Sequence, residues 1–115
     1  MNNNIVLLIR KLKTLTSENR LLWQSTSDPE GYSCLISNKS IFIKKFKSKP
    51  PNRRYIEFNI FIMNFNGEIL DRIEIKSNDN PDDNETYIDM TALFNLAQRR
   101  IQGQGDLIEE ILSQL

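Results

Sequence analysis

The 115-residue chain contains no histidine, a single cysteine and only four glycines. Histidine is the side chain that titrates near neutral pH, and it is the commonest metal ligand. Its absence excludes Ser-His-Asp and Cys-His catalysis and every histidine-based metal site. One cysteine cannot form a thiolate zinc cage or an intramolecular disulfide. The scattered glycines form neither a Walker loop nor a dinucleotide-binding fingerprint. We therefore expect no metal and no cofactor.

The composition is that of an ordinary globular protein, with 39% hydrophobic and 26% charged residues. The length predicts a single domain over 1–115. Fifteen basic and fifteen acidic residues cancel, so no overall field favours nucleic acid or a membrane. The apolar run at residues 5–9 is too short for a signal peptide or a membrane span. With Cys34 as a lone thiol, these features predict a cytoplasmic protein.

The spacing of apolar residues predicts an amphipathic helix over residues 4–16. The period then changes to two, and it predicts five strands over residues 21–25, 32–37, 41–46, 55–65 and 69–75. Asn38-Lys39 is a candidate hairpin turn between the second and third strands, and Asn66-Gly67 is a stronger one between the last two. We interpret residues 77–85 as a polar connection.

Two further helices are predicted at the end of the chain. Asp89 is a candidate cap for a helix through Ile101, which Gly103 or Gly105 would end. Asp106 resembles a capping residue for a final helix with the inner face Leu107, Ile108, Ile111, Leu112 and Leu115. The predicted fold is α+β: an N-terminal helix, a five-stranded antiparallel meander and two C-terminal helices, with the helices covering the sheet.

The fourth predicted strand is apolar on both faces. One row is Ile56, Phe58, Ile60 and Ile62, and the other is Phe61, Met63 and Phe65. If the helices cover one face only, the second is closed by sheet curvature or used for dimerisation. Trp23 is most simply a core anchor, although tryptophan is also favoured at interfaces. The candidate interaction residues are therefore Trp23, Phe61, Met63 and Phe65.

A basic segment spans residues 44–54. It contains Lys44, Lys45, Lys47, Lys49, Arg53 and Arg54, with Phe46 among them and Tyr55 beside them. Cations that neutralise phosphates and rings that stack on bases are typical of single-stranded nucleic-acid binding. The simpler interpretation is a solvated hairpin end whose lysines and prolines protect a sheet edge.

Carboxylates supply two further candidate sites. Asp79, Asp82, Asp83, Glu85 and Asp89 are hard oxygen donors, but they lack the spacing and the glycine of a calcium loop. Glu57, Asp71 and Glu74 are the candidates for carboxylate-based acid/base catalysis. Asp71 shares its alternation with isoleucines, so it is either exposed by a bulge or sheet end, or buried beside an arginine.

Both ends of the chain resemble a set of small bacterial proteins of unknown function. Residues 12–23 (LKTLTSENRLLW) match their Leu-rich helix, Leu-Thr turn and Leu-x-Trp strand. Residues 93–99 (LFNLAQR) and 108–112 (IEEIL) are similar to their closing helices, with Gln98 in place of the first arginine of an Ala-Arg-Arg motif. The resemblance implies one complete domain and no particular activity.

These observations favour a non-enzymatic cytoplasmic module that binds another protein or itself. An adaptor and an immunity- or antitoxin-like binder are equally compatible with them. The first alternative is single-stranded nucleic-acid binding through residues 44–54, and the second is a carboxylate-based enzyme.

Overall fold

The first helix is formed as predicted. The computed structural model describes residues 3–47, 56–76, 81–103 and 110–115, and only the backbone of residues 81–83. Helix α1 (Asn3–Ser17) is followed by Asn19, whose φ is 62°. The N–H of Arg20 donates to the carbonyl of Leu15 (2.8 Å) and that of Asn19 to Thr16 (3.1 Å). This pattern satisfies the last carbonyls of the helix, and asparagine tolerates the left-handed conformation that it needs.

The sheet is a five-stranded antiparallel meander in the order β1-β2-β3-β4-β5, as predicted. The strands are β1 (Gln24–Ser25), β2 (Gly31–Ile36), β3 (Lys39–Lys47), β4 (Ile56–Asn64) and β5 (Ile69–Lys76). The predicted turn at Asn66-Gly67 is confirmed, because Gly67 has a φ of 85° and its N–H donates to Asn64. The predicted Asn38-Lys39 turn is displaced by one residue. Ile36 pairs with Lys39, and Ser37 takes the positive φ of 57°.

Strand β1 is shorter than the predicted 21–25 because Trp23 leaves the ladder for the core. Trp23 is 4% exposed, and its indole Nε1 donates to the Thr16 hydroxyl at 2.9 Å. That hydroxyl donates in turn to the carbonyl of Leu12 at 2.7 Å. The indole thus connects the end of α1 to the start of the sheet. Trp23 is therefore a core anchor, the simpler of the two interpretations of its sequence position.

The second helix begins earlier than its predicted start at Asp89. Helix α2 (Pro81–Gln102) includes part of the segment that we interpreted as a polar connection. Proline is favoured at the first position of a helix, where its missing N–H costs nothing. The predicted end is confirmed, because Gly103 has a φ of 71° and its N–H donates to Arg100.

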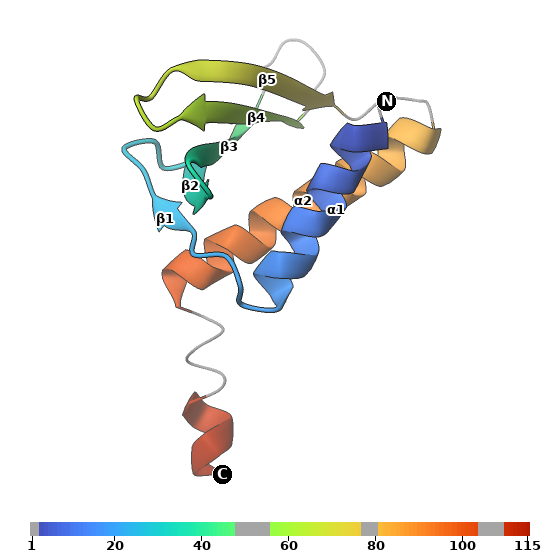
Figure 1. Cartoon of the computed structure of the whole chain (residues 1–115). Coiled ribbons are helices and arrows are strands. Elements are labelled where there is room, and N and C mark those ends of the chain that lie inside the picture. Colours follow the sequence, from blue (N-terminus) through green and yellow to red (C-terminus); the bar gives the residue numbers. More distant parts are fainter. Residues whose placement is uncertain (1–2, 48–55, 77–80, 104–109) are drawn as a thin grey trace.

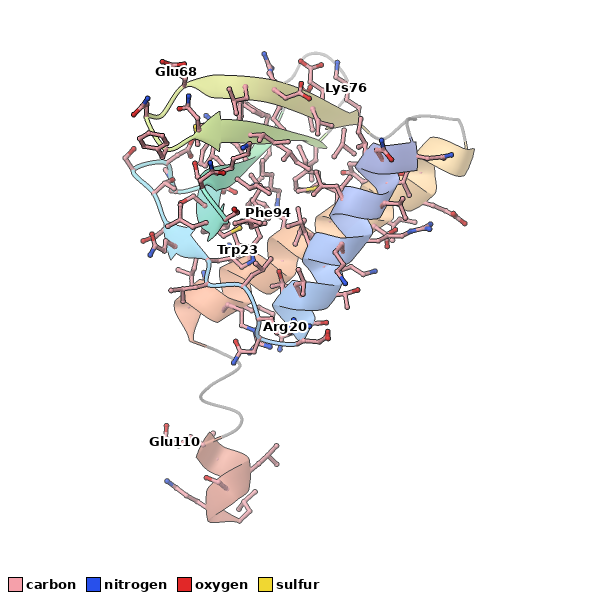
Figure 2. All side chains as sticks on the ribbon, in the orientation of Figure 1. Arg20, Trp23, Glu68, Lys76, Phe94 and Glu110 are labelled. Carbon is pink, nitrogen blue, oxygen red and sulfur yellow. The ribbon has the colours of Figure 1, made fainter. Side chains whose placement is uncertain are left out.

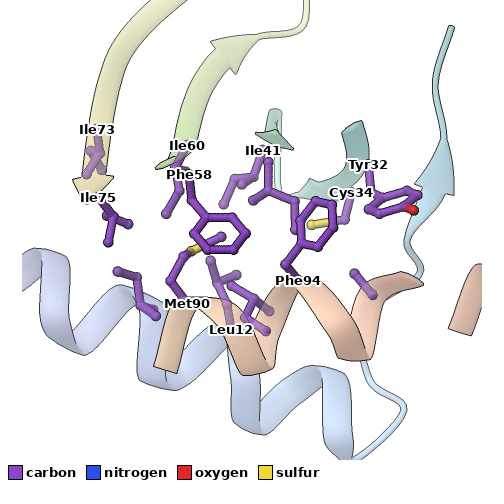
Figure 3. Close-up of a cluster of buried hydrophobic side chains, with 14 of the residues drawn as sticks. Leu12, Tyr32, Cys34, Ile41, Phe58, Ile60, Ile73, Ile75, Met90 and Phe94 are labelled. Atoms are coloured by element: carbon purple, nitrogen blue, oxygen red, sulfur yellow. The ribbon is translucent and has the colours of Figure 1, made fainter. Parts of the chain in front are cut away.

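Helices α1 and α2 lie side by side on one face of the sheet (Figure 1). Between them and the strands lies the hydrophobic core (Figure 3), whose members include Ile9, Leu12, Ile43, Phe58, Ile60, Ile75, Met90, Leu93, Phe94 and Ala97. The ring of Phe94 lies at its centre, 5.1 Å from that of Tyr32 and 5.5 Å from that of Phe58. The helix-covered face of the sheet is therefore the structural face.

The last helix does not complete the cover of the sheet, so that prediction is wrong. Residues 110–114 are helical, but they lie apart from the rest of the fold (Figure 1). Ile111, Leu112 and Leu115 are 58%, 64% and 96% exposed. Periodicity identified an apolar helix face, but it does not say what that face contacts. Asp106, Leu107 and Ile108 lie outside the described residues.

Candidate functional site

The face of the sheet opposite the helices carries a row of apolar side chains on four strands. Side chains alternate between the two faces along each strand. The register aligns Phe42 with Phe61, and Met63 with both Ser40 and Ile69. We call this surface the open face, and its apolar members are Leu35, Phe42, Phe46, Phe61, Met63 and Ile69.

An aromatic pair lies at the centre of the open face. The rings of Phe42 and Phe61 have centroids 5.6 Å apart, and the guanidinium carbon of Arg72 lies 5.7 Å from the Phe61 centroid. Gly31 permits this arrangement, because a β-carbon there would lie 2.5 Å from two atoms of the Phe42 ring. The pair is therefore seated closely on β2 and held by its neighbours within the sheet.

Apolar side chains around this pair extend into solvent. Leu35 is 73% exposed and Ile69 is 60% exposed. Phe65 is 81% exposed in the turn after β4. An exposed group of large apolar side chains on one surface is typical of a site where another molecule binds. Of the predicted interaction residues, the structure places Phe61 and Met63 on the open face, Phe65 at its end and Trp23 in the core.

The cations of the open face are paired with carboxylates. Lys44 Nζ lies 2.6 Å from Asp28 and 4.5 Å from the centroid of Phe46. The hydrogen bond from Lys44, together with one from the backbone N–H of Glu30, lowers the pKa of Asp28. Farther along the sheet, Lys76 lies 3.9 Å from both Glu57 and Glu74 (Figure 2 labels Lys76). The described part of the open face therefore offers little free charge of either sign.

A buried amide lies beneath the side chain of Arg72. Asn59 is 0% exposed, and its Oδ1 accepts a hydrogen bond from Arg72 Nε at 3.0 Å. Arg72 also lies 3.0 Å from Glu74. The Asn59 Nδ2 donor has no hydrogen-bond partner in the described part of the chain. These contacts fix Arg72 over the middle of the open face.

The predicted basic segment does not gather its described lysines on one surface. Lys44 and Phe46 lie on the open face, whereas Lys45 lies on the helix-covered face, 5.7 Å from the centroid of Phe94. Lys47 is exposed at the end of β3. Lys49, Arg53, Arg54 and Tyr55 lie outside the described residues. Strand alternation therefore separates neighbouring lysines that the sequence places together.

The candidate catalytic carboxylates are either exposed to solvent or held in ion pairs. Asp71 is exposed at a β-bulge, because the register shifts between Ile62 and Met63; this matches the first of its two sequence-based interpretations. Glu57 and Glu74 form the ion pairs described above. Cys34 is buried, and burial raises the pKa of its thiol to about 12. A thiol in this state is a poor nucleophile at neutral pH.

Glu85 and Asp89, from the acidic group of residues 79–89, connect helices α1 and α2. Asp89 accepts hydrogen bonds from Lys13 (2.8 Å) and Arg10 (3.3 Å), and Glu85 lies 3.8 Å from Arg10. Partial burial raises the pKa of Asp89, but the two cations outweigh it, so the pKa is lowered overall. Asp79 and the side chains of Asp82 and Asp83 lie outside the described residues. Within the described ranges, no group of three or more Cys, Asp or Glu is placed to hold a metal ion.

Sequence reasoning missed Leu35, Phe42 and Ile69 as members of the open face. The signal was present in the alternation of each strand, but joining them required the register between strands. Comparison of the chain with protein-family models, curated proteins and solved structures finds no match. No helix within the described ranges is long and apolar enough to cross a membrane.

Proposed function

We propose that this protein is a non-enzymatic cytoplasmic interaction module that binds another protein through the open face. The observation that carries the proposal is the uncovered apolar surface formed by Leu35 on β2, Phe42 on β3, Phe61 and Met63 on β4, and Ile69 on β5. Helices α1 and α2 complete a core on the other face without using these side chains. Adaptor and immunity- or antitoxin-like roles both fit a partner that covers this surface.

Electrostatics indicates what kind of partner surface fits. The ion pairs of Lys44 with Asp28 and of Lys76 with Glu57 leave apolar contact as the main attraction. Phe42 and Phe61 offer ring faces and edges that are already held in place, so little side-chain entropy is lost on binding. We expect a partner with an apolar patch and a polar rim, which is the usual anatomy of a protein–protein interface.

Two matched variants test the proposal. Leu35→Ser and Ile88→Ser remove aliphatic side chains that are 73% and 64% exposed, the first on the open face and the second on helix α2. Tagged wild-type protein and both variants are used for affinity capture from the native host, followed by mass spectrometry. We expect Leu35→Ser to lose the captured partner and Ile88→Ser to retain it.

Titration calorimetry with the purified partner then measures the affinity of each variant. At least a tenfold loss for Leu35→Ser, with little change for Ile88→Ser, supports the proposal. The reverse pattern, or equal affinity for both variants, contradicts it.

A further inference from the structure

The two edges of the sheet differ in how they are protected. A free edge presents unpaired backbone N–H and C=O groups, and proteins usually shorten it, bulge it or place proline or an inward charge there. Strand β1 has only two residues. Strand β5 (Ile69–Lys76) has eight residues and no proline, and Figure 1 shows it as the outermost strand on the other side. Its bulge with β4 affects only its beginning.

The second half of β5 is a regular edge. Asp71, the charged residue that shares the alternation of its isoleucines, lies just before it beside the bulge and accepts a hydrogen bond from the N–H of Arg72 at 2.8 Å. Ile73 and Ile75 point towards the core and are 8% and 0% exposed. Arg72, Glu74 and Lys76 alternate with them and lie on the open face. In an antiparallel ladder, alternate residues direct their backbone groups away from the neighbouring strand. No described strand of this chain pairs with that side of β5.

We infer that β5 pairs with β5 of a second copy of this chain, in an antiparallel register centred on Ile73. The charges select this register. Arg72 and Glu74 pair with each other at 3.0 Å within one chain, and in this register Arg72 also faces Glu74 of the other copy, so the two-fold axis joins the two pairs into a network of four charges. A shift of the pairing in one direction places Arg72 opposite Arg72, and a shift in the other places Glu74 opposite Glu74. Like charges directly opposite each other are destabilising.

On the helix side of the strand, the central pair of this register is apolar. Ile73 faces Ile73 across the symmetry axis and extends the core row, and on either side of this pair Ile75 faces the exposed Asp71 of the other copy. A register between these would align core-facing residues of one strand with outward-facing residues of the other, so side chains would lie on the wrong face of the sheet. The interface is isologous, as in most symmetric dimers. It goes beyond the proposed function because it uses the edge of the sheet and leaves the apolar members of the open face free for another protein.

The oligomeric state of the full chain is the first test. Sedimentation velocity across a concentration series should show a reversible monomer–dimer equilibrium for the wild type. Arg72→Glu and Glu74→Arg each create two like-charged contacts across the axis, so each should weaken the dimer by about tenfold or more. A wild type that is strictly monomeric at high micromolar concentration, or variants that dimerise unchanged, would overturn the inference.

Mixing the two variants is the sharper test. The introduced carboxylate and arginine are complementary across the axis, so an equimolar mixture of Arg72→Glu and Glu74→Arg should recover a one-to-one heterodimer, detected by native mass spectrometry. Each variant lacks the Arg72–Glu74 ion pair within its own chain, so recovery must come from contact between chains. A mixture that stays monomeric contradicts the register.

Amide hydrogen exchange of the wild type covers the case in which a variant does not fold. The amides of residues 74 and 76 should exchange more slowly as concentration rises, while those of β1 stay unchanged. The amide of Arg72 already donates to Asp71 within one chain and is not used as a readout. Exchange that is independent of concentration, or protection of β1 in place of β5, would overturn the inference. If Leu35→Ser abolished the dimer and Arg72→Glu did not, the contact would lie on the open face, and the inferred β5–β5 pairing would be overturned.

Discussion

On strand β4, Phe58 and Phe61 point to opposite faces of the sheet. Phe58 is 2% exposed, and its ring contacts Phe94 and Tyr87 on α2, at centroid distances of 5.5 and 5.7 Å. Among the described ring contacts, those of Phe61 are with Phe42 and Arg72, which are both side chains of the sheet itself. One strand therefore contributes to the core on one face and to an uncovered apolar surface on the other. Substitutions should therefore divide into those that alter unfolding and those that alter binding.

The largest expected difference is between Phe58→Ala and Phe61→Ala. The first leaves a cavity in the core and should lower the free energy of unfolding by about 3–5 kcal/mol. The second removes an aromatic contact from a partly exposed site and should cost about 1 kcal/mol. Equilibrium denaturation in urea measures both values. If Phe58→Ala does not fold, the milder pair Phe58→Leu and Phe61→Leu preserves the comparison. Equal losses at the two positions would show that the faces are not distinct.

A second prediction concerns how closely the open face is packed. Gly31→Ala places a methyl group against the Phe42 ring, so we expect a loss of about 1–2 kcal/mol in the free energy of unfolding. The same substitution made in a Phe42→Leu background should cost much less, because the shorter side chain leaves room. A double-mutant cycle measures this coupling. Additive losses would mean that the ring does not lie over Gly31.

The smallest effect is a pH dependence on the helix side. The pKa of Asp89 is lowered in the folded state by Lys13 and Arg10. A lowered folded pKa means that this stabilisation is present above the unfolded pKa, about 3.9, and is lost as pH falls through the folded value. Because this ion pair lies near the surface, Asp89→Asn should reduce stability at pH 7 by about 1 kcal/mol or less.

The measurement is the denaturation midpoint of both proteins between pH 7 and pH 2. The difference between wild type and Asp89→Asn should shrink towards the acid end of this range. Ser17→Ala, on the exposed end of α1, is the control and should follow the wild-type profile. A difference that grows on acidification would contradict the assigned sign.

Local patterns in the sequence were enough to predict most of the fold. Helix α1, the five strands and the Asn66-Gly67 turn follow from periodicity and turn chemistry over a few neighbouring residues. The start of α2 was missed because its first residues are as polar as a loop, and Pro81 favours a helix start only when a helix follows. The exposure of Ile111 and Leu112 was missed because an apolar helix face does not identify its own partner.

The candidate site was less predictable because it depends on register. Phe61 and Met63 were identified from alternation within one strand, but Phe42 joins them only through pairing with β3. The same alternation places Lys44 and Lys45 on opposite faces, which the run of basic residues concealed. The ion pair of Lys44 with Asp28 links distant segments and has no local signal.

The most direct test of the open face as the binding surface is a nuclear magnetic resonance titration of the isotope-labelled chain with its captured partner. We predict that the signals of Leu35, Phe61 and Met63 shift or broaden on binding, and that those of Leu7 and Ile88 on the outer surfaces of the helices do not. Changes confined to Leu7 and Ile88, with Leu35 and Phe61 unaffected, would contradict the account.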